Sequence, residues 1–230
     1  MPVIDGEQVP FDEAIAFLRD KVRLPTDRWT DIWQGMHSRA FVVAGARQAD
    51  LLEDFHRAVR RAVEEGITLE TFREDFDRIV ARHGWSYRGS RGWRSRVIFA
   101  TNLRTAYAAG RWEQIQRLKD RRPWLRYMAV MDGRTRPEHA AWHGTILPAD
   151  HPWWRTHYPP NGWNCRCIAQ QLSDEDLERF GYSPSEVAPE IDWQDRTVNT
   201  ADGQQLVRVP QGIDTGWAYN VGEAGWAADL

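Results

Sequence analysis

Two histidines and two cysteines lie close together in the sequence, and their types and spacing suit the binding of zinc. His139 and His143 are four residues apart in a helical pattern, so both imidazoles are expected on one helix face. Cys165 and Cys167 alternate in an extended segment, which places both thiols on one side. Two nitrogen and two sulfur ligands make a closed tetrahedral site without a position for substrate. We therefore expect structural zinc, with Asp132 accepting a hydrogen bond from a ligand imidazole or replacing a ligand.

A metal-free interpretation also fits these residues. C-x-C is a less usual zinc spacing than C-x-x-C, buried free cysteines are common, and the histidines could hydrogen-bond within a tryptophan-rich core. The tryptophans of the same segment are Trp142, Trp153, Trp154 and Trp163. We expect them to anchor a chain rich in proline and glycine rather than to form a ligand cage. His151 and His157 are alternative ligands, although no spacing favours them.

Catalysis by such a metal has little support in the sequence. The motif H-E-x-x-H supplies a glutamate base beside zinc, whereas His-Ala-Ala-Trp-His has no carboxylate between the histidines. A glycine-rich phosphate loop and a G-x-S-x-G nucleophile motif are also absent from the sequence. We expect a protein that is not an enzyme. A metal-dependent hydrolase would have to use Asp132 or Glu138 as its base.

Apolar residues recur at helical spacing through most of the first 120 residues. The predicted helices span 11–22, 46–66, 68–84 and 93–120. Thr68 is expected to cap the third of these, and Gly84 to end it. After Pro123 the pattern predicts a strand over 124–132, a short helix over 136–144, a segment over 145–164 with no regular structure except short extended pieces, and a second strand over 165–173.

These elements predict an α+β fold in which a helical N-terminal half packs on a small sheet. A loop-rich lobe, stapled by zinc, would occupy residues 127–172, and an extended, partly irregular arm would follow. We divide the chain into a helical region (1–90), a core with the His/Cys lobe (91–173) and an acidic arm (174–230). A length of 230 residues suits one core with extensions.

The sequence also bears on the compartment in which the protein works. Its longest apolar runs are far too short to span a bilayer, and its first residues lack the pattern of a secretion signal, so we expect no membrane partner. The two cysteines are separated by one residue, which excludes a disulfide framework. A reducing compartment is therefore expected.

Charge is distributed unevenly along the chain. Residues 86–126 contain eleven Lys or Arg and two Asp or Glu, whereas residues 174–230 contain three and twelve. Such a basic block and acidic tail are compatible with a nucleic-acid surface, with pairing between the two segments, or with solvated helix faces that have no partner.

Three segments form an ordered set of motifs: TNLRTAYAAGR (101–111), YMAVMDGRTRPEHAAWHG (127–144) and HYPPNGWNCRC (157–167). They combine a helix with Thr and Arg, an Asp followed by Arg-Thr-Arg and two histidines, and Pro-Pro before C-x-C. This set resembles the phage Mu F-like family of minor head proteins, also called phage head morphogenesis proteins. The ending VPQGIDTGWAYNVG (209–222) is similar to the Mu branch. The resemblance implies a characteristic polar set of Asp132, His139, His143, Cys165 and Cys167.

The resemblance implies a structural minor capsid protein of a tailed phage, associated with the portal vertex or the capsid interior and acting in head morphogenesis. Its implied partners are the phage portal protein and capsid or scaffold proteins. Its implied location is the virion, with the host cytoplasm as the place of assembly. Two other functions stay open, a metal-dependent nuclease or hydrolase and a free-standing, non-specific DNA-binding adaptor.

With this resemblance, the basic residues of the segment 86–126 become candidates for contacting packaged double-stranded DNA. The arginines that could serve are Arg94, Arg96, Arg104 and Arg111 on the central helix. Their contacts with phosphates would be independent of sequence and sensitive to salt. Pairing with the acidic tail or with carboxylates of the portal protein is the alternative.

Overall fold

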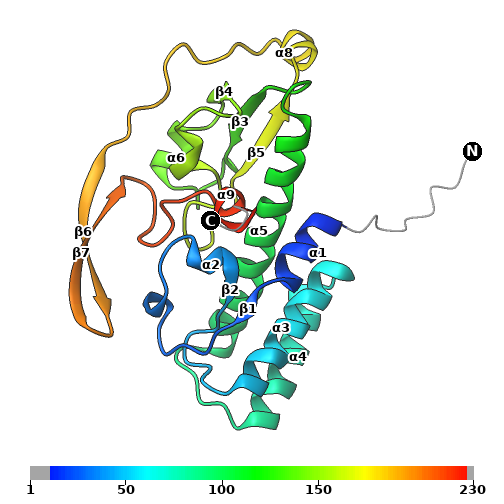
Figure 1. The fold of residues 1–230 in the computed structure, drawn as a ribbon, viewed down its shortest axis with the longest axis vertical. Coiled ribbons are helices and arrows are strands. Elements are labelled where there is room, and N and C mark those ends of the chain that lie inside the picture. The colour runs from blue at the N-terminus through cyan, green and yellow to red at the C-terminus, as the bar shows by residue number, and fades with distance from the viewer. Residues whose placement is uncertain (1–10, 227–230) are drawn as a thin grey trace, which may run out of the picture.

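The computed structural model describes residues 11–226, with only the backbone of Trp226 included. Within these residues the chain forms helices and three small sheets, which confirms the predicted α+β fold (Figure 1). The long helix α5 (Arg91–Leu118) runs through the molecule, with helices α1, α3 and α4 packed at its side and a sheet near its C-terminal end. No helix in the described part of the chain is both long and apolar enough to cross a membrane.

The N-terminal helices α1 (Asp12–Arg19), α3 (Ala49–Glu64) and α4 (Leu69–His83) correspond to three of the predicted ones. Helix α3 is amphipathic, since its apolar residues fall on one side at helical spacing. The apolar residues that it buries include Leu51, Leu52, Phe55, Val59 and Val63. This face packs on α4 and α1 and forms much of the core.

Both predicted ends of α4 are confirmed. The Thr68 hydroxyl accepts the N–H of Thr71 at 3.3 Å, which satisfies a free donor of the first turn. Gly84 ends the helix with a φ of +58°, a left-handed conformation that glycine adopts without a Cβ clash.

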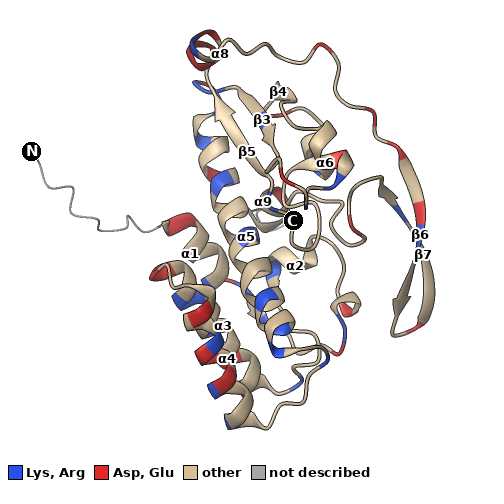
Figure 2. Cartoon of the chain, turned by 180° about the vertical axis from the view of Figure 1, so that it is seen from behind, with Lys and Arg blue, Asp and Glu red and all other residues tan. Residues whose placement is uncertain are grey.

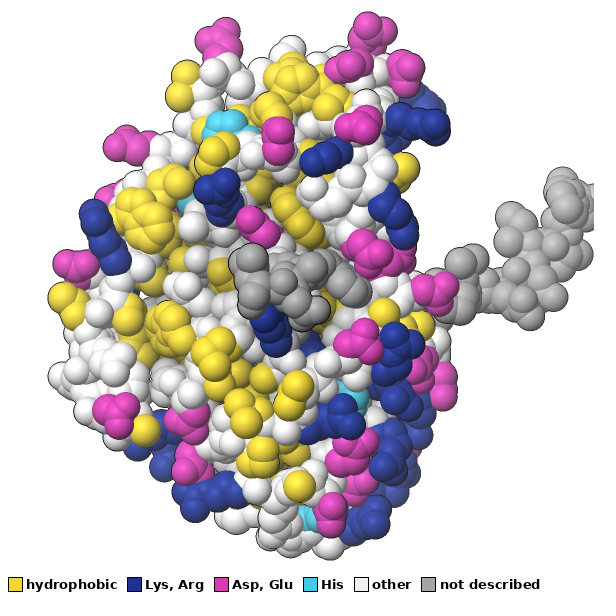
Figure 3. All heavy atoms as spheres, viewed as in Figure 1, with side chains coloured by type: hydrophobic (Ala, Val, Ile, Leu, Met, Phe, Trp, Pro, Cys, Tyr) yellow, Lys and Arg dark blue, Asp and Glu magenta, His cyan; other side chains and the backbone are white. Residues whose placement is uncertain are grey.

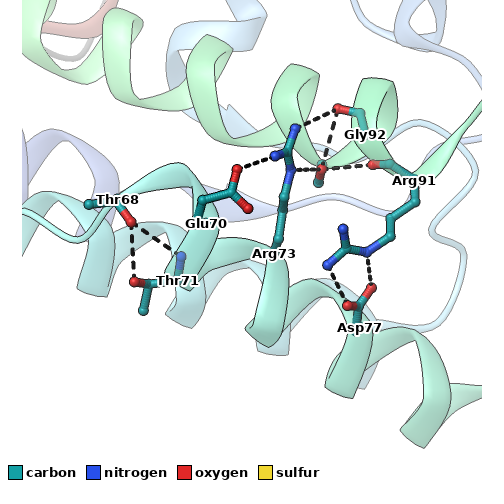
Figure 4. A network of polar contacts seen from close by, with 8 residues as sticks. Thr68, Glu70, Thr71, Arg73, Asp77, Arg91 and Gly92 are labelled. Atoms are coloured by element: carbon teal, nitrogen blue, oxygen red, sulfur yellow. Dashed lines mark hydrogen bonds and ion pairs between the residues drawn. The ribbon is translucent and has the colours of Figure 1, made fainter.

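Polar contacts fix α4 against the start of α5 (Figure 4). Arg91 pairs with Asp77 through two contacts of 2.7 and 2.6 Å, and Arg73 Nε donates to Ser95 Oγ at 3.3 Å. Ser90 caps α5 by accepting the N–H of Trp93 at 3.2 Å. The N-terminal end of α5 is therefore held both by its own cap and by the neighbouring helix.

Helix α1 approaches the middle of α5 closely. A Cβ on Gly110 would lie 2.7 Å from the backbone nitrogen of Ala14, so only glycine allows this distance between the two helices. Ala106 and Ala109 are fully buried on the same helix. Small side chains on α5 thus allow the N-terminal helices to pack against it.

The main sheet has the strand order β4-β3-β5 and is antiparallel. Strand β3 (Trp124–Met128) lies in the middle, β5 (Ile168–Leu172) pairs along its whole length, and β4 (Ile146–Pro148) is a short edge. Leu125 and Tyr127 on β3 are fully buried, as alternation predicts. Strand β4 is a short extended piece of the kind predicted for residues 145–164, whereas helix α7 (Trp154–His157) in the same segment was not predicted.

Four very short elements before α3 are absent from the sequence-based prediction. They are β1 (Val22–Arg23), the 3-10 helix η1 (Trp29–Asp31), α2 (Met36–Arg39) and β2 (Ala40–Phe41). Strands β1 and β2 pair in parallel, with Val22 opposite Ala40. Elements of two to four residues are too short to show a period.

The predicted C-terminal arm extends over a smaller part of the chain than expected. After α8 (Asp174–Phe180), strands β6 (Trp193–Thr200) and β7 (Gly203–Pro210) form a hairpin along one side of the molecule (Figure 1). Beyond it the chain returns to the core, where Ile213, Trp217 and Val221 are buried. Helix α9 (Val221–Trp226) packs on α5 and α2. Residues 211–226 therefore pack with the core.

Candidate metal centre

Three of the predicted ligands meet in the structure: His139, Cys165 and Cys167, hereafter the His/Cys cluster. Their ligand atoms all lie within 4.8 Å of one another, and all three residues are buried. The Nδ1 atom of His139 is 3.7 Å from Cys165 Sγ and 3.4 Å from Cys167 Sγ. His139 comes from helix α6 (Pro137–Ala141), and both cysteines lie just before β5.

The orientation of the His139 ring suits a metal ligand. Its Nε2 lies 2.9 Å from the carbonyl oxygen of Gly212, to which it must donate a proton. The remaining nitrogen, Nδ1, then has a free lone pair directed at the two sulfurs. Trp142 stacks on the ring with centroids 5.1 Å apart, which fixes the plane of the imidazole. A carbonyl acceptor behind a histidine is the usual support of a metal-binding imidazole.

The two thiols are electrostatically coupled. The hydrogen bond with Cys167, together with those from His139 and the Asn161 backbone, lowers the pKa of the Cys165 thiol despite its burial. The same hydrogen bond to Cys165, together with burial, raises the pKa of Cys167. One thiolate is thus already favoured in the pair. Zinc binds thiolates, so a divalent cation would replace the shared proton.

His143 does not join the cluster, which corrects the predicted set of four. Helix α6 ends at Ala141, so the spacing of four residues no longer carries both imidazoles to one face. The Nδ1 of His143 instead accepts the backbone N–H of Ala129 at 3.1 Å. The ring supports the end of β3 rather than a shared ion.

The alternative ligands His151 and His157 also lie elsewhere. His151 Nδ1 accepts the N–H of Trp153 at 3.1 Å. His157 is buried, stacks on Trp153 at 4.3 Å, and has its pKa lowered to about 4 by burial. Trp142, Trp153 and Trp154 are buried in the same core, as the anchoring role predicts.

Asp132 contacts the cysteine segment through Arg166, not through an imidazole. Its carboxylate receives two contacts from the Arg166 guanidinium, at 2.7 and 2.6 Å. This pairing, followed by the backbone N–H of Arg134, holds the pKa of Asp132 well below its usual range. Because Arg166 stands between Cys165 and Cys167, the ion pair positions the C-x-C segment.

A C-terminal segment that sequence reasoning did not assign to the site completes its surroundings. Gly212 provides the acceptor for His139, and a Cβ there would lie 2.6 Å from Glu138 and 2.8 Å from Trp142. Asp214 Oδ2 accepts from Arg136 at 2.7 Å and from the N–H of Trp163 at 2.7 Å. Residues 209–222 stood out in the sequence only for their similarity to the Mu branch of the family, and no chemical role was predicted for them.

The cluster leaves one side open. A cavity of about 120 Å³ borders all three residues, together with Arg134, Arg136 and Arg166. Among the described residues that line it there is no Asp or Glu, so a water bound to a metal would lack a carboxylate base. One imidazole and two thiolates suit zinc, with the fourth position left for a ligand that is not a protein side chain. Their chemistry fits zinc better than magnesium or calcium, which prefer oxygen.

The four arginines of the central helix have different surroundings. Arg94 is buried, donates through Nη2 to the Ala44 carbonyl and lies over the Trp85 ring, so the prediction that it faces DNA is wrong. Arg96 is exposed. Arg104 and Arg111 line a cavity of about 330 Å³ that also borders the two cysteines.

Pairing between the basic block and the acidic tail occurs at one end of α5. Arg122 forms a salt bridge with Asp176 on α8. Arg91 and Arg117 instead pair with acids of α4 and α1. Figure 2 shows Lys and Arg at several levels along α5, with Asp and Glu grouped on α8. The tail therefore neutralises only part of the block in the described chain.

Comparison with known proteins gives consistent matches. A family model for Phage Mu protein F like protein matches residues 53–170. Over 248 aligned residues the chain is 36% identical to capsid assembly protein F of Escherichia phage Mu, with 96% of this chain and 56% of that protein covered. The Mu-like prophage FluMu F protein of Haemophilus influenzae is 32% identical over 226 residues, with 89% and 55% covered.

The chain spans about half the length of the curated relatives it matches. No solved structure gives a significant match. The family match covers α3, α4, α5, the main sheet and the His/Cys cluster, and the alignments to the relatives extend over nearly the whole chain. The chain therefore belongs to the Phage Mu protein F like family.

Proposed function

We propose that the chain is a structural component of the phage head that acts in capsid assembly. The observation that supports this most directly is the match to capsid assembly protein F of phage Mu over 96% of the chain. In this proposal the protein is a minor capsid protein located in the virion and assembled in the host cytoplasm. Its partners are the portal protein and other capsid or scaffold proteins.

The proposed role of the His/Cys cluster is structural. Zinc held by His139, Cys165 and Cys167 would join α6 to the segment that leads into β5. The absence of a carboxylate among the described residues lining the adjacent cavity supports a protein without catalytic activity. The zinc would then add to the apolar core formed by Trp142, Trp153 and Trp154 by fixing the loops around it.

Contact with packaged DNA belongs to the same proposal. Arg96 and Arg111 are exposed and, with the half-buried Arg104, offer cations on one helix without a base-reading motif. Binding through these residues would weaken steeply as salt is raised. Arg94 has no part in it, because its side chain is buried.

The test uses a phage genome that carries this gene, with the gene deleted and the protein supplied from a plasmid. Purified heads are analysed by mass spectrometry, and infectious particles are counted. We expect the chain in the heads at low copy, and loss of DNA-filled heads when it is missing. A normal yield of infectious particles without the chain would contradict the proposal.

Co-expression with the portal protein separates this function from a free-standing DNA-binding adaptor. We expect the chain and the portal protein to co-purify at a salt concentration that removes DNA. Binding to DNA that is steeply salt-dependent, without any association with the portal protein, would favour the adaptor instead.

A metal-dependent hydrolase is the second candidate, because three protein ligands leave one metal position facing a cavity. Enzymes with three protein ligands use that position to activate water. Turnover of plasmid or single-stranded DNA is therefore measured with zinc, magnesium and manganese, with His139→Ala as the control. Activity that disappears in the variant would favour this candidate over a purely structural zinc.

A further inference from the structure

A larger cavity, of about 340 Å³, lies where several parts of the chain meet. Its walls come from α5, from the segment between Lys21 and Ala44, from Trp163 and Asn164 just before the cysteines, and from the C-terminal segment before α9. None of the residues of the His/Cys cluster lines it. Its volume is at the lower end of the range for small-molecule sites, roughly 300–1,000 Å³.

The walls are mainly apolar and aromatic. The tryptophans that line the cavity are Trp29, Trp93, Trp163 and Trp217. Val42, Val43, Val97 and Ile98 add aliphatic surface. Figure 3 shows hydrophobic side chains gathered over the middle of this face, in the region where Figure 1 has β1 and β2. An aromatic or branched aliphatic group would therefore find a matching surface here.

Two buried cations also line this cavity. Lys21 is 4% exposed and Arg94 is 9% exposed. The Lys21 ammonium donates to the His37 carbonyl at 2.7 Å, and one Nη of Arg94 donates to the Ala44 carbonyl. The Nε of Arg94 is buried without a hydrogen-bond partner among the described residues.

No carboxylate in the described chain compensates these charges at the cavity. The titratable residues that line it are Lys21, His37, Arg94 and Tyr219, and none is a carboxylic acid. Burial accordingly lowers the pKa of Lys21 to about 7 and lowers that of Arg94. Buried charges are ordinarily paired, since an unpaired one retains the cost of leaving water.

We propose that this cavity binds a carboxylate attached to an aromatic or branched apolar group, with Arg94 and Lys21 as its counter-ions. The carboxylate lies beside the positive side chains of Arg94 and Lys21, and the apolar part packs among the tryptophans. The ligand is either a free organic acid or an acidic residue beside an apolar one in a segment of a partner protein. This site is independent of the metal and of the role in head assembly.

The first test compares two probes of equal shape on the full wild-type chain, 3-phenylpropionate and 3-phenylpropanamide. Binding is measured by saturation-transfer NMR and by titration of protein resonances. We expect the carboxylate to bind at least about tenfold more tightly than the amide, because charge-assisted hydrogen bonds are stronger than neutral ones. Equal affinities, or no binding of either probe, would overturn the proposal.

Two variants then test whether Arg94 and Lys21 provide the positive charge that the carboxylate recognises. In Arg94→Met and in Lys21→Met we expect the preference for the carboxylate to fall below about threefold. The matched control is Arg96→Met, which removes an exposed cation two residues from Arg94 that does not line the cavity. A preference kept in both test variants would refute the assignment. If one variant fails to fold, the other variant and the comparison of the two probes on the wild-type chain still test the proposal.

Peptides distinguish the two sources of ligand. N-acetyl-Phe-Glu-amide is compared with N-acetyl-Phe-Gln-amide on the same chain. Selective binding of the glutamate peptide supports a segment of a partner protein. Binding restricted to the free acid supports a small molecule, and either result is consistent with the proposed chemistry.

Discussion

At the scale of single residues, the tautomer of His139 determines what the His/Cys cluster can hold. The Gly212 carbonyl takes the Nε2 proton, so Nδ1 faces Cys165 and Cys167 as an acceptor or a metal ligand. His143 has the same residue type and lies four positions away, yet its Nδ1 serves the backbone of Ala129. Residue type therefore does not distinguish a ligand from a structural hydrogen-bond acceptor here.

The first prediction concerns metal content. Native mass spectrometry should find one zinc per chain, and the zinc should be lost in His139→Ala and in Cys165→Ser/Cys167→Ser. The double serine variant should also melt at a sharply lower temperature, because structural zinc contributes on the order of 10 kcal/mol to folding. His143→Ala is the control and should keep the zinc. An unchanged melting temperature in the double variant would rule out a metal staple.

The second prediction is a pH dependence due to Lys21. Burial lowers its pKa to about 7 in the folded chain, well below the ordinary lysine value near 10.5. Between these values the unfolded chain binds more protons, so the free energy of unfolding should rise with pH, by up to about 1.4 kcal/mol per unit. Below pH 7 lysine is protonated in both states and adds no slope.

Urea denaturation at pH 7, 8 and 9 measures this slope. Lys21→Met should flatten it and stabilise the chain at pH 7, because the cost of burying a charge is removed. The nearby His37, whose pKa burial lowers to about 4, stays neutral over this range and does not contribute. Equal slopes in the wild type and the variant would show that Lys21 is not the cause.

At the scale of elements, the contact between α6 and the segment around Gly212 holds the His139 ring in place. Gly212→Ala should destabilise the chain by at least about 2 kcal/mol, since its φ is +81° and the added Cβ meets Glu138 and Trp142. It should also weaken zinc binding, because the acceptor of His139 moves. Chemical denaturation and competition with a chelator measure the two effects.

The matched control is Gly144→Ala. Gly144 has a similar φ of +88°, but a Cβ there would meet nothing within 4 Å. Gly144→Ala should lower the free energy of unfolding by only about 1 kcal/mol, the cost of placing alanine in a left-handed backbone conformation, and should leave the affinity for zinc unchanged. If both variants lost zinc to the same degree, the close contact at Gly212 would not be responsible.

The sequence correctly predicted the elements that are determined by patterns within a single short stretch of residues. Helices α3, α4 and α5 have long apolar periods, and Thr68 and Gly84 mark the ends of α4. The C-terminal end of helix α6 was predicted three residues too far along the chain, and that error placed His143 among the ligands. The bond from His139 to Gly212 joins residues 73 positions apart, so no local pattern could have indicated it.

At the scale of the whole molecule, the hairpin β6–β7 can be separated from the rest. Gln194 and Val209 are register partners, and the strands beyond them are mostly exposed. Replacing 195–208 by Asn-Gly should therefore give a short hairpin and lower the melting temperature by about 10 °C or less. Zinc content should not change.

Thermal unfolding followed by circular dichroism checks this prediction. The lost contacts include the hydrogen bonds from Arg28 to Thr200 and from Thr30 to Asn199, which tie the hairpin to η1. Trp217→Ala is the contrasting variant, because Trp217 is buried in the core and its loss should cost about 3–5 kcal/mol. A larger effect of the shortened hairpin would mean that it is part of the core.

The return of residues 211–226 to the core also sets the order in which the protein can acquire its structure. The Ser38 hydroxyl donates to the carbonyl of Val221, 183 positions later, and the Arg39 side chain donates to that of Ala224. During synthesis on the ribosome, the contacts between α2 and α9 and the hydrogen bond from His139 to Gly212 can therefore form only after residues 211–226 have been made. Contacts between residues so distant in sequence form slowly, and the nascent chain exposes its apolar faces meanwhile. A chaperone would have its longest opportunity to bind in that interval.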